Sequence, residues 1–335
     1  LQITAAGAPL ETVELPDPVT GPKDVLHAIE ADGICRSDVH YRSRTRPVPS
    51  LPLVPRHEDD GTVLADGDAV TCRSPGDRVA LHYLVTCGAC EFCRRGAEQF
   101  CTTGAMLGLD RQGGYAERIV VPARNAHLVP NGVSIAAAAV MMCSTATSLH
   151  ALRRGRAGPG TSVALLGVGG LGMSAIQLAR VIGADPIYAI DIDPGKLEIA
   201  ADLGAIPIDG REDAVAAVLG AGGVDVAIEL VGSSDLMADA VRMLRPQGRA
   251  VAVGITHTEF GLDPYRDLVK REAEVIGTAD HLPDEIEQIL DWAAEGKIDI
   301  DRLVTGTIPL ELDAVEDALV ALERFDGGIR TVIQP

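Results

Sequence analysis

A glycine-rich turn between two apolar stretches is the feature that most limits how this 335-residue chain can fold. The apolar run Ser162–Leu166 predicts a buried parallel strand, and apolar residues at helical spacing follow it as far as Ala179. Between them GVGGLG has the GxGxxG spacing, and a second apolar run, Pro186–Ile190, leads directly into Asp191. Strand, glycines, helix, strand and acid thus occur in the order of a nucleotide-binding βαβ unit. The stretch predicts a doubly wound parallel sheet of the α/β class.

Each part of this unit has a physical reason. The first glycine permits the tight turn, the second lets the backbone approach a pyrophosphate, and the third lets the helix pack on the strand. A carboxylate at Asp191 would meet the adenosine ribose and repel a 2′-phosphate, so NAD is favoured over NADP, and Lys196 would reach the same ribose. A glycine-rich turn of some other α/β protein is the alternative. The candidate cofactor-binding residues here are Gly167, Gly169, Gly170, Leu171, Gly172, Asp191, Lys196, Val231 and Gly254.

The α/β alternation continues downstream, with a helical pattern at Asp235–Leu244. Gly232 and Pro246–Gly248 mark loops at strand ends. About six parallel strands result, which complete a Rossmann sheet. The further strand-like runs are Ile206–Asp209, Val224–Val231, Arg249–Ile255 and Glu274–Thr278.

Length and charge restrict the number of domains and the kinds of partner that the chain can have. A chain of this length with 47% hydrophobic residues fits two domains, and its formal charge is 29 − 48 = −19. Such a surface repels nucleic-acid phosphates and anionic lipid, so we expect neither as a partner, and we expect no membrane span. The first residues, LQITAAGAPLETVELPDP, lack signal-peptide features and predict a strand. The expected location is therefore a reducing cytoplasm, where clustered cysteines more often mean metal than disulfide.

Four of the seven cysteines form one such cluster. Cys87, Cys90 and Cys93 have CxxCxxC spacing, and Cys101 closes the loop. Structural zinc takes four thiolates in a tetrahedron, which suits a surface lobe with little core of its own. Iron–sulfur motifs share the CxxCxxC start but usually place the fourth ligand differently, and disulfides are disfavoured by the compartment. We expect a structural zinc site here.

A second metal site is suggested by the segments GICRSDVH, PRHEDDG and MMCSTATSLHAL. They offer Cys35, His57 and Cys143, a Cys₂His set that leaves one position open on a catalytic zinc. Spacing alone makes this no more than a candidate, because a lone buried cysteine is most often a core residue.

At these residues the chain resembles the zinc-dependent medium-chain alcohol dehydrogenase family. The resemblance rests on GICRSDVH, the HE of RHEDDG, the four-cysteine lobe, GGYAERIVVP, CSTAT, GVGGLG and GIRTVIQP, in the family's order over nearly the whole chain. It implies an oxidoreductase that moves hydride reversibly between an alcohol and NAD, with one catalytic and one structural zinc. A polyol or sugar-alcohol dehydrogenase, an aldehyde reductase, and a non-catalytic NAD-binding redox sensor remain as alternatives.

The resemblance also implies roles for single residues. Cys35, His57 and Cys143 would hold the catalytic zinc, Glu58 would be a transient ligand, and Asp38 would accept a hydrogen bond from the His57 ring. A cysteine rather than a carboxylate as third ligand points to the alcohol dehydrogenase branch.

Proton transfer and cofactor contacts are implied in the same way. Ser37 would pass the alcohol proton, through a ribose hydroxyl, toward His40, although His40 also reads as an exposed loop residue. For Tyr83 and Leu84, the two candidates for lining the substrate, the alternative is that they are ordinary core residues of a strand. The implied contacts are Arg36 and Arg330 at the pyrophosphate, Thr147 at the nicotinamide, and Tyr83 and Leu84 at the substrate.

Some positions depart from the family pattern. Arg56 stands where the family usually has glycine, and Asp59 and Asp60 stand at positions that are usually small or apolar. Buried acids there would be costly unless paired, and Arg56 is the expected partner of one of them. Cys72 matches no ligand position and is a spare thiol.

The expected layout has a catalytic, mostly β, GroES-like domain at 1–146 that carries both zinc ions. An NAD-binding Rossmann domain follows at 147–280, and 281–335 returns to complete the first domain. The active site is expected in the cleft between the domains. Family members are oligomers, and a homotetramer is favoured over a dimer.

Overall fold

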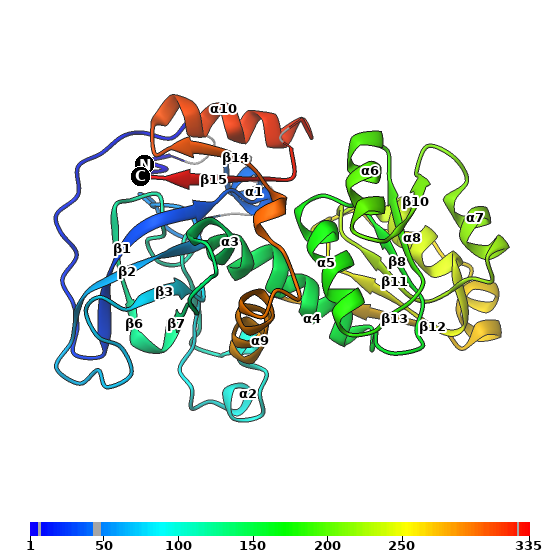
Figure 1. Cartoon of the computed structure of the whole chain (residues 1–335), viewed down its shortest axis with the longest axis horizontal. Coiled ribbons are helices and arrows are strands. Elements are labelled where there is room, and N and C mark those ends of the chain that lie inside the picture. Colours follow the sequence, from blue (N-terminus) through cyan, green and yellow to red (C-terminus); the bar gives the residue numbers. More distant parts are fainter. Residues whose placement is uncertain (6–7, 43–47, 327) are drawn as a thin grey trace. The chain divides into compact units, whose positions relative to one another are not determined.

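The computed structural model describes residues 1–5, 8–42, 48–326 and 328–335. The described chain forms two compact units, one of Leu1–Ser144 together with Leu282–Pro335 and one of Thr145–His281 (Figure 1).

The unit Thr145–His281 is built on a six-stranded parallel sheet with the order β10-β9-β8-β11-β12-β13. The order runs outward from β8 in one direction and then in the other, which confirms the predicted doubly wound fold. The strands are β8 (Val163–Leu166), β9 (Ile187–Asp191), β10 (Ile206–Asp209), β11 (Val224–Glu229), β12 (Leu244–Ala252) and β13 (Glu274–Gly277).

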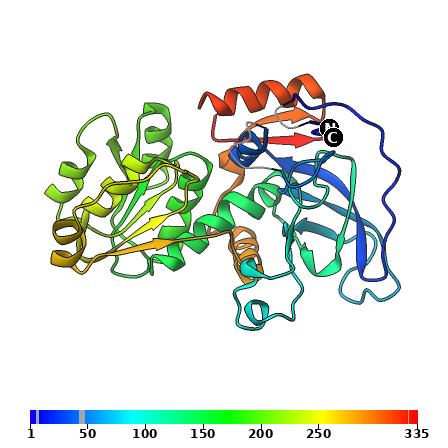
Figure 2. The ribbon, with the colours of Figure 1, turned by 180° about the vertical axis from the view of Figure 1, so that it is seen from behind.

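Helices connect these strands and lie on both faces of the sheet (Figures 1 and 2). Three begin at a side chain that accepts a backbone N–H of the first turn, namely Asp193, Asp213 and Ser233. The helices are α4 (Ala146–Arg154), α5 (Gly170–Val181), α6 (Pro194–Asp202), α7 (Ala214–Gly220) and α8 (Ser234–Arg242), with helical turns at Pro264–Leu268 and Val269–Arg271.

Strand β12 differs from the prediction. It begins at Leu244, so Pro246–Gly248 lies inside the strand and not in a loop beyond its end. Val224 of β11 pairs with Leu244, but Val226 already pairs with Arg249, so the intervening residues bulge out of the ladder. Proline has no N–H to give to a ladder, and a bulge lets the strand accommodate it.

The other unit contains a mostly antiparallel seven-stranded sheet. Its order is β14-β15-β1-β2-β3-β7, with β6 also paired to β1 and only β14–β15 parallel. A short hairpin, β4–β5, stands apart from it. The strands are β1 (Asp24–Gly33), β2 (Asp59–Asp66), β3 (Arg78–Leu81), β4 (Leu84–Val85), β5 (Ala105–Met106), β6 (Arg118–Pro122), β7 (Ala126–Leu128), β14 (Val304–Pro309) and β15 (Arg330–Gln334).

The end of β1 prepares a polar site. Side chains alternate between buried and half-buried along most of the strand, but its last residues, Asp32 and Gly33, are both buried. Asp32 lies in register with Asp59, the first residue of β2. The sheet therefore places two acids side by side next to His57.

Short helices surround this sheet. A π-helical turn, Met141–Thr145, follows α3 and contains Cys143. The helices are α1 (Arg36–Arg42), α2 (Glu91–Arg94), α3 (Ile135–Val140), α9 (Pro283–Ala294) and α10 (Leu312–Glu323), with 3₁₀ turns at Glu98–Phe100, Ala123–Asn125 and Asp301–Leu303.

One smaller expectation needs correction, and one helix bears on the expected absence of a membrane span. The first described residues form isolated bridges, Gln2 to Glu11 and Ile3 to Leu53, and not a regular strand. The continuous helix Ile135–Arg154, with mean hydropathy 1.5, is long and apolar enough to cross a membrane by length and composition. Because 83% of its apolar window is buried inside the structure, it has the surroundings of a core helix.

Candidate metal and dinucleotide sites

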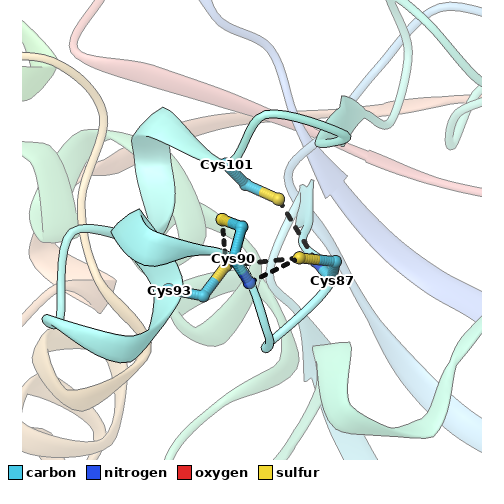
Figure 3. A group of neighbouring side chains, drawn as sticks. All are labelled: Cys87, Cys90, Cys93 and Cys101. Carbon is cyan, nitrogen blue, oxygen red and sulfur yellow. Dashed lines mark hydrogen bonds between the residues drawn. The ribbon is translucent and has the colours of Figure 1, made fainter.

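The four clustered cysteines turn their sulfur atoms toward one another (Figure 3). All four Sγ atoms lie within 4.8 Å of one another, with Cys90 to Cys93 at 3.5 Å and Cys87 to Cys93 at 3.8 Å. A tetrahedron with Zn–S bonds of about 2.3 Å separates its sulfurs by about 3.8 Å, whereas a disulfide needs about 2.05 Å. The spacing of these thiols therefore fits one tetrahedral metal ion.

Backbone N–H groups support these thiols as ligands. The amides of Ala89 and Cys90 donate to Cys87 Sγ at 3.4 and 3.2 Å, and that of Cys87 donates to Cys101 Sγ at 3.3 Å. The donors from Ala89 and Cys90 lower the pKa of Cys87, and backbone donors lower that of Cys90 to about 6. Thiolates are the form that binds metal, so these bonds favour the ligand state at Cys87 and Cys90, whereas burial raises the pKa of the Cys93 thiol to about 12.

A second cluster joins four buried side chains that are distant in sequence. Cys35, His57, Glu58 and Cys143 each place one ligand atom within 4.8 Å of all the others, and the two sulfurs are 3.9 Å apart. The sulfur separation again matches two ligands of one tetrahedral ion. The structure thus brings together the Cys₂His set and the acid that sequence and resemblance single out.

Three separate elements position this second cluster. Cys35 follows the central strand β1 and precedes α1. His57 and Glu58 lie just before β2, which pairs with β1. Cys143 lies in the π-helical turn, a local widening of the helix that is frequent at functional sites.

The electrostatics of the cluster follow from its burial. Contact with Cys143 lowers the pKa of Cys35 well below its usual range, and the same contact raises the pKa of Cys143. Desolvation raises the pKa of Glu58 to about 7, although Glu58 forms an ion pair with Arg330. Arg330 is itself 5% exposed.

The hydrogen bond expected between His57 and Asp38 does not form. Asp38 Oδ2 accepts instead from the Cys35 amide at 3.0 Å and from Arg56. Neither ring nitrogen of His57 has a hydrogen-bond partner among the described residues. The ring is packed edge-on against Tyr83, with 4.9 Å between ring centroids.

The expected pairing of Arg56 with one of the two departing acids is also wrong. Arg56 Nε donates to Asp32 at 2.6 Å, and Asp60 is paired with Arg78 at 3.3 Å. Asp59 is fully buried, and neither of its carboxylate oxygens has a hydrogen-bond partner in the described part of the chain. Burial raises the pKa of Asp59 to about 6.

The remaining predicted residues of this unit lie near the cluster or at its border. Ser37 Oγ is 3.6 Å from Cys35 Sγ. Half-buried His40 lies on α1. Half-buried Leu84 packs against the core that contains Tyr83. Arg36 donates to the Leu322 carbonyl at 3.4 Å, and its guanidinium lies 3.8 Å from the Phe325 ring centroid. Cys72 is exposed and belongs to neither thiol cluster.

The glycine turn has the shape that its motif predicts. Gly167 has φ +94°, a left-handed conformation that suits glycine. A Cβ on Gly172 would lie 2.3 Å from the Gly167 carbonyl oxygen, so helix and turn pack without room for a side chain. A Cβ on Gly169 would meet no heavy atom within 4 Å. The open space beside this N-cap of α5 is where a pyrophosphate would approach.

The acid that ends β9 holds this turn in place. Asp191 Oδ2 accepts the Val168 amide at 2.8 Å, and its Oδ1 accepts the Asp193 amide at 3.0 Å. Lys196 is 3.7 Å from Asp193 on the first turn of α6. The remaining candidates of this region lie at the start of α5 (Gly170 and Leu171) and at the loops after β11 and β12 (Val231 and Gly254).

A buried acid, Glu229, holds the loop after β11, and the loop after β12 packs closely against that loop. Glu229 Oε1 accepts the amides of Val231, Gly232 and Ser233 at 2.8 to 3.2 Å. A Cβ on Gly254 would lie 2.0 Å from the Gly232 nitrogen. On α4, Thr147 Oγ1 lies 3.4 Å from His281 Nδ1.

Sequence reasoning missed Asp32, which is 1% exposed and paired with Arg56. It also missed Tyr115, whose buried hydroxyl has no hydrogen-bond partner among the described residues. One signal in the sequence could have identified Asp32. It is an acid at the end of a strand whose other residues alternate, and Asp59 and Asp60 are two further acids that the family pattern does not explain.

Comparisons with known proteins agree with this geometry. The model of the alcohol dehydrogenase GroES-like domain matches residues 21–131, and that of the zinc-binding dehydrogenase matches 170–295. An alcohol dehydrogenase of Geobacillus stearothermophilus is 34% identical over 330 residues, which cover 97% of this chain and 95% of the relative. NADP-dependent alcohol dehydrogenase C 1 of Mycolicibacterium smegmatis is 32% identical over 87% of this chain and 86% of its own.

Similarity extends to solved structures. Alcohol dehydrogenase TADH from Thermus sp. ATN1 is 30% identical, with a TM-score of 0.91 over 99% of this chain and 98% of that one. These matches confirm the resemblance found in the sequence and make the protein an oxidoreductase whose family implies zinc and a nicotinamide cofactor. The chain belongs to the zinc-dependent medium-chain dehydrogenase family.

Proposed function

We propose that the protein is an NAD-dependent zinc alcohol dehydrogenase that interconverts an alcohol with its aldehyde or ketone. The observation that carries the proposal is the buried cluster of Cys35, His57 and Cys143, with Glu58 beside it, in a chain that also has a complete dinucleotide turn. Zinc held by these residues would supply Lewis acidity, which lowers the pKa of an alcohol hydroxyl or polarises a carbonyl.

The protein's own groups supply position and proton transfer. Cys35 and Cys143 are 5% and 8% exposed, so their sulfurs are shielded from bulk water. The Ser37 hydroxyl, beside Cys35, would accept the alcohol proton at Oγ, and His40 on the same helix would release it to water. Tyr83 supports the proposal by filling the space beside the His57 ring.

The choice of NAD rests on acids at the strand ends. Asp191 lies in register with Asp209 on the adjacent strand β10, so two carboxylates face the place expected for the adenosine ribose. The nearby bases are engaged, Lys196 with Asp193 and Arg211 with Asp209 at 2.5 Å. A 2′-phosphate would meet repulsion there without an unpaired base to offset it.

We also propose two zinc ions per chain, one at each cysteine cluster, and a homotetramer. Elemental analysis and light scattering of the purified protein measure these two quantities.

The direct test is a panel of primary and secondary alcohols, diols and polyols, and aldehydes. Turnover is followed by the absorbance of reduced nicotinamide, with NAD and NADP in parallel. Cys35→Ser should abolish turnover while NADH still binds. The proposal fails if wild-type protein holds metal only at the Cys87–Cys101 lobe, or if Cys35→Ser turns over near the wild-type rate. Turnover of polyols alone would assign the polyol branch instead.

A further inference from the structure

Arg56 is a completely buried charged group of this chain's candidate catalytic site. Its side chain is 0% exposed, and its guanidinium meets carboxylates from three segments. Nε lies 2.6 Å from Asp32 at the end of β1, NH1 pairs with Asp38 in α1, and NH2 lies 3.7 Å from Glu58. One planar group with several donors in a fixed geometry thus links strand, helix and loop.

The backbone of Arg56 is held as tightly as its side chain. Its φ of +103° is a region that glycine favours and that other residues adopt only when their surroundings impose it. A Cβ on Gly108 would lie 2.3 Å from the Arg56 nitrogen, and one on Gly113 would lie 2.1 Å from its carbonyl oxygen. Two glycines therefore let neighbouring backbone close around this residue.

The groups that Arg56 touches lead directly to candidate metal ligands. Asp38 accepts the amide of Cys35 at 3.0 Å, so the carboxylate that Arg56 holds also fixes the Cys35 backbone. Glu58 is itself a member of the cluster. Within the described ranges the His57 ring, by contrast, has no carboxylate partner of the kind that usually orients a histidine ligand.

We propose that Arg56 is a positioning residue of the metal site, which holds Cys35 through Asp38 and holds Glu58 directly, in place of a carboxylate partner for His57. The proposal rests on the proposed function, since it takes the Cys35 cluster to be the catalytic zinc site. Other charged groups that face this network are Arg330, paired with Glu58, and the unpaired carboxyl of Asp59.

The test uses full-length protein reloaded with Co(II), whose visible bands report the coordination geometry. The double variant Cys35→Ser/Cys143→Ser, which lacks both thiolates of the Cys35 cluster, supplies the sulfur-to-cobalt bands of the four-cysteine lobe alone for subtraction. Arg56→Met removes the guanidinium, and Arg56→Lys keeps the positive charge but not the planar set of N–H donors. Arg56→Gly removes the whole side chain and places glycine, which suits the positive φ, at this position. Arg78→Met is the matched control, because it also deprives a buried aspartate, Asp60, of its guanidinium but touches no member of the cluster.

Arg56→Met and Arg56→Gly should change the Co(II) bands of the Cys35 site and weaken its affinity for Co(II), measured by chelator competition, by about ten- to a hundredfold. Arg56→Lys should fall between these variants and wild type, and Arg78→Met should keep both the bands and the affinity. The lobe should retain its metal in all of them. If Arg56→Met does not fold, Arg56→Gly decides.

Two outcomes distinguish a failure of the positioning role from a failure of the proposed function. Folded Arg56 variants with wild-type bands and affinity would overturn the positioning role and leave the proposed function intact. Wild-type protein that binds Co(II) only at the lobe would refute the proposed function, and the positioning role with it.

Discussion

Two glycines of the same turn should respond oppositely to the same added methyl group. Gly169→Ala should leave the stability of the protein nearly unchanged and weaken dinucleotide binding, because a Cβ there enters open space. Gly172→Ala should destabilise the fold, because its Cβ would lie 2.3 Å from the Gly167 oxygen and 3.2 Å from Val168. The pair separates a glycine needed for a ligand from a glycine needed for packing.

The magnitudes follow from the local backbone. Gly169 has φ −76° and ψ −152°, which alanine can adopt, so the loss of unfolded-state freedom stabilises by about 0.4–1 kcal/mol. Alanine is a poorer N-cap residue than glycine, and this cost offsets a similar amount of that stabilisation. The net change in unfolding free energy is therefore within about 0.5 kcal/mol. At Gly172 the neighbour is backbone that cannot rotate away, so the cost is about 1–3 kcal/mol, as for other overpacked interiors.

Urea unfolding measures the stability of each variant, and NADH fluorescence titration measures its affinity for the dinucleotide. For Gly169→Ala we expect a wild-type unfolding midpoint with binding at least about tenfold weaker, a loss of about 1.4 kcal/mol. Wild-type NADH affinity in Gly169→Ala would show that the open space beside the turn is not the pyrophosphate site. Equal destabilisation by both substitutions would refute the packing argument.

Three further changes test other parts of the molecule. Burial lowers the pKa of His27 from 6.5 to about 3, so below pH 6.5 the unfolded chain takes up a proton that the folded chain refuses, and stability falls as the pH falls. His27→Leu should therefore lose about 2 kcal/mol less than wild type between pH 7 and pH 5 in urea unfolding, and equal losses would contradict the assignment. Cys90→Ser should release the lobe metal and speed tryptic cleavage at exposed Arg94 by about tenfold or more, as seen on gels; unchanged cleavage would mean that the lobe needs no metal. Asp191→Ser should raise the ratio of NADP to NAD turnover by about tenfold, and an unchanged ratio would remove Asp191 from cofactor selection.

Much of the fold was predictable because its signals are local. The six parallel strands show as short apolar runs, and the glycine turn joins two of them with its acid in place. The four-cysteine lobe is equally local, since Cys87 to Cys101 span one short loop. In both cases residues close in sequence determine each other's geometry, so spacing alone carries the prediction.

The second cluster depended on resemblance because its members meet only through the tertiary fold. Cys35 and Cys143 are separated by 108 positions, and no spacing rule brings them to 3.9 Å. The partners of Arg56 lay further still from prediction. Charge favoured its pairing with a nearby acid, yet Asp60 pairs with Arg78, and the Arg56 guanidinium, on a backbone with φ +103°, meets Asp32 and Asp38 from other segments.

The buried charged groups around the Cys35 cluster include Asp59, one of the two acids that depart from the family pattern. Four carboxyl groups face two guanidinium groups, the carboxyls being those of Asp32, Asp38, Glu58 and Asp59 and the guanidiniums those of Arg56 and Arg330. Burial raises the pKa of Glu58 to about 7 and that of Asp59 to about 6, although the nearby arginines lower both, so near neutral pH these acids carry charge only at a cost. A divalent cation on the adjacent ligands would add two positive charges at the same place and favour their ionised forms. Asp59, the one departing acid in this group, should therefore make the stability of the metal-loaded protein depend more strongly on its metal than ligand identity alone would require.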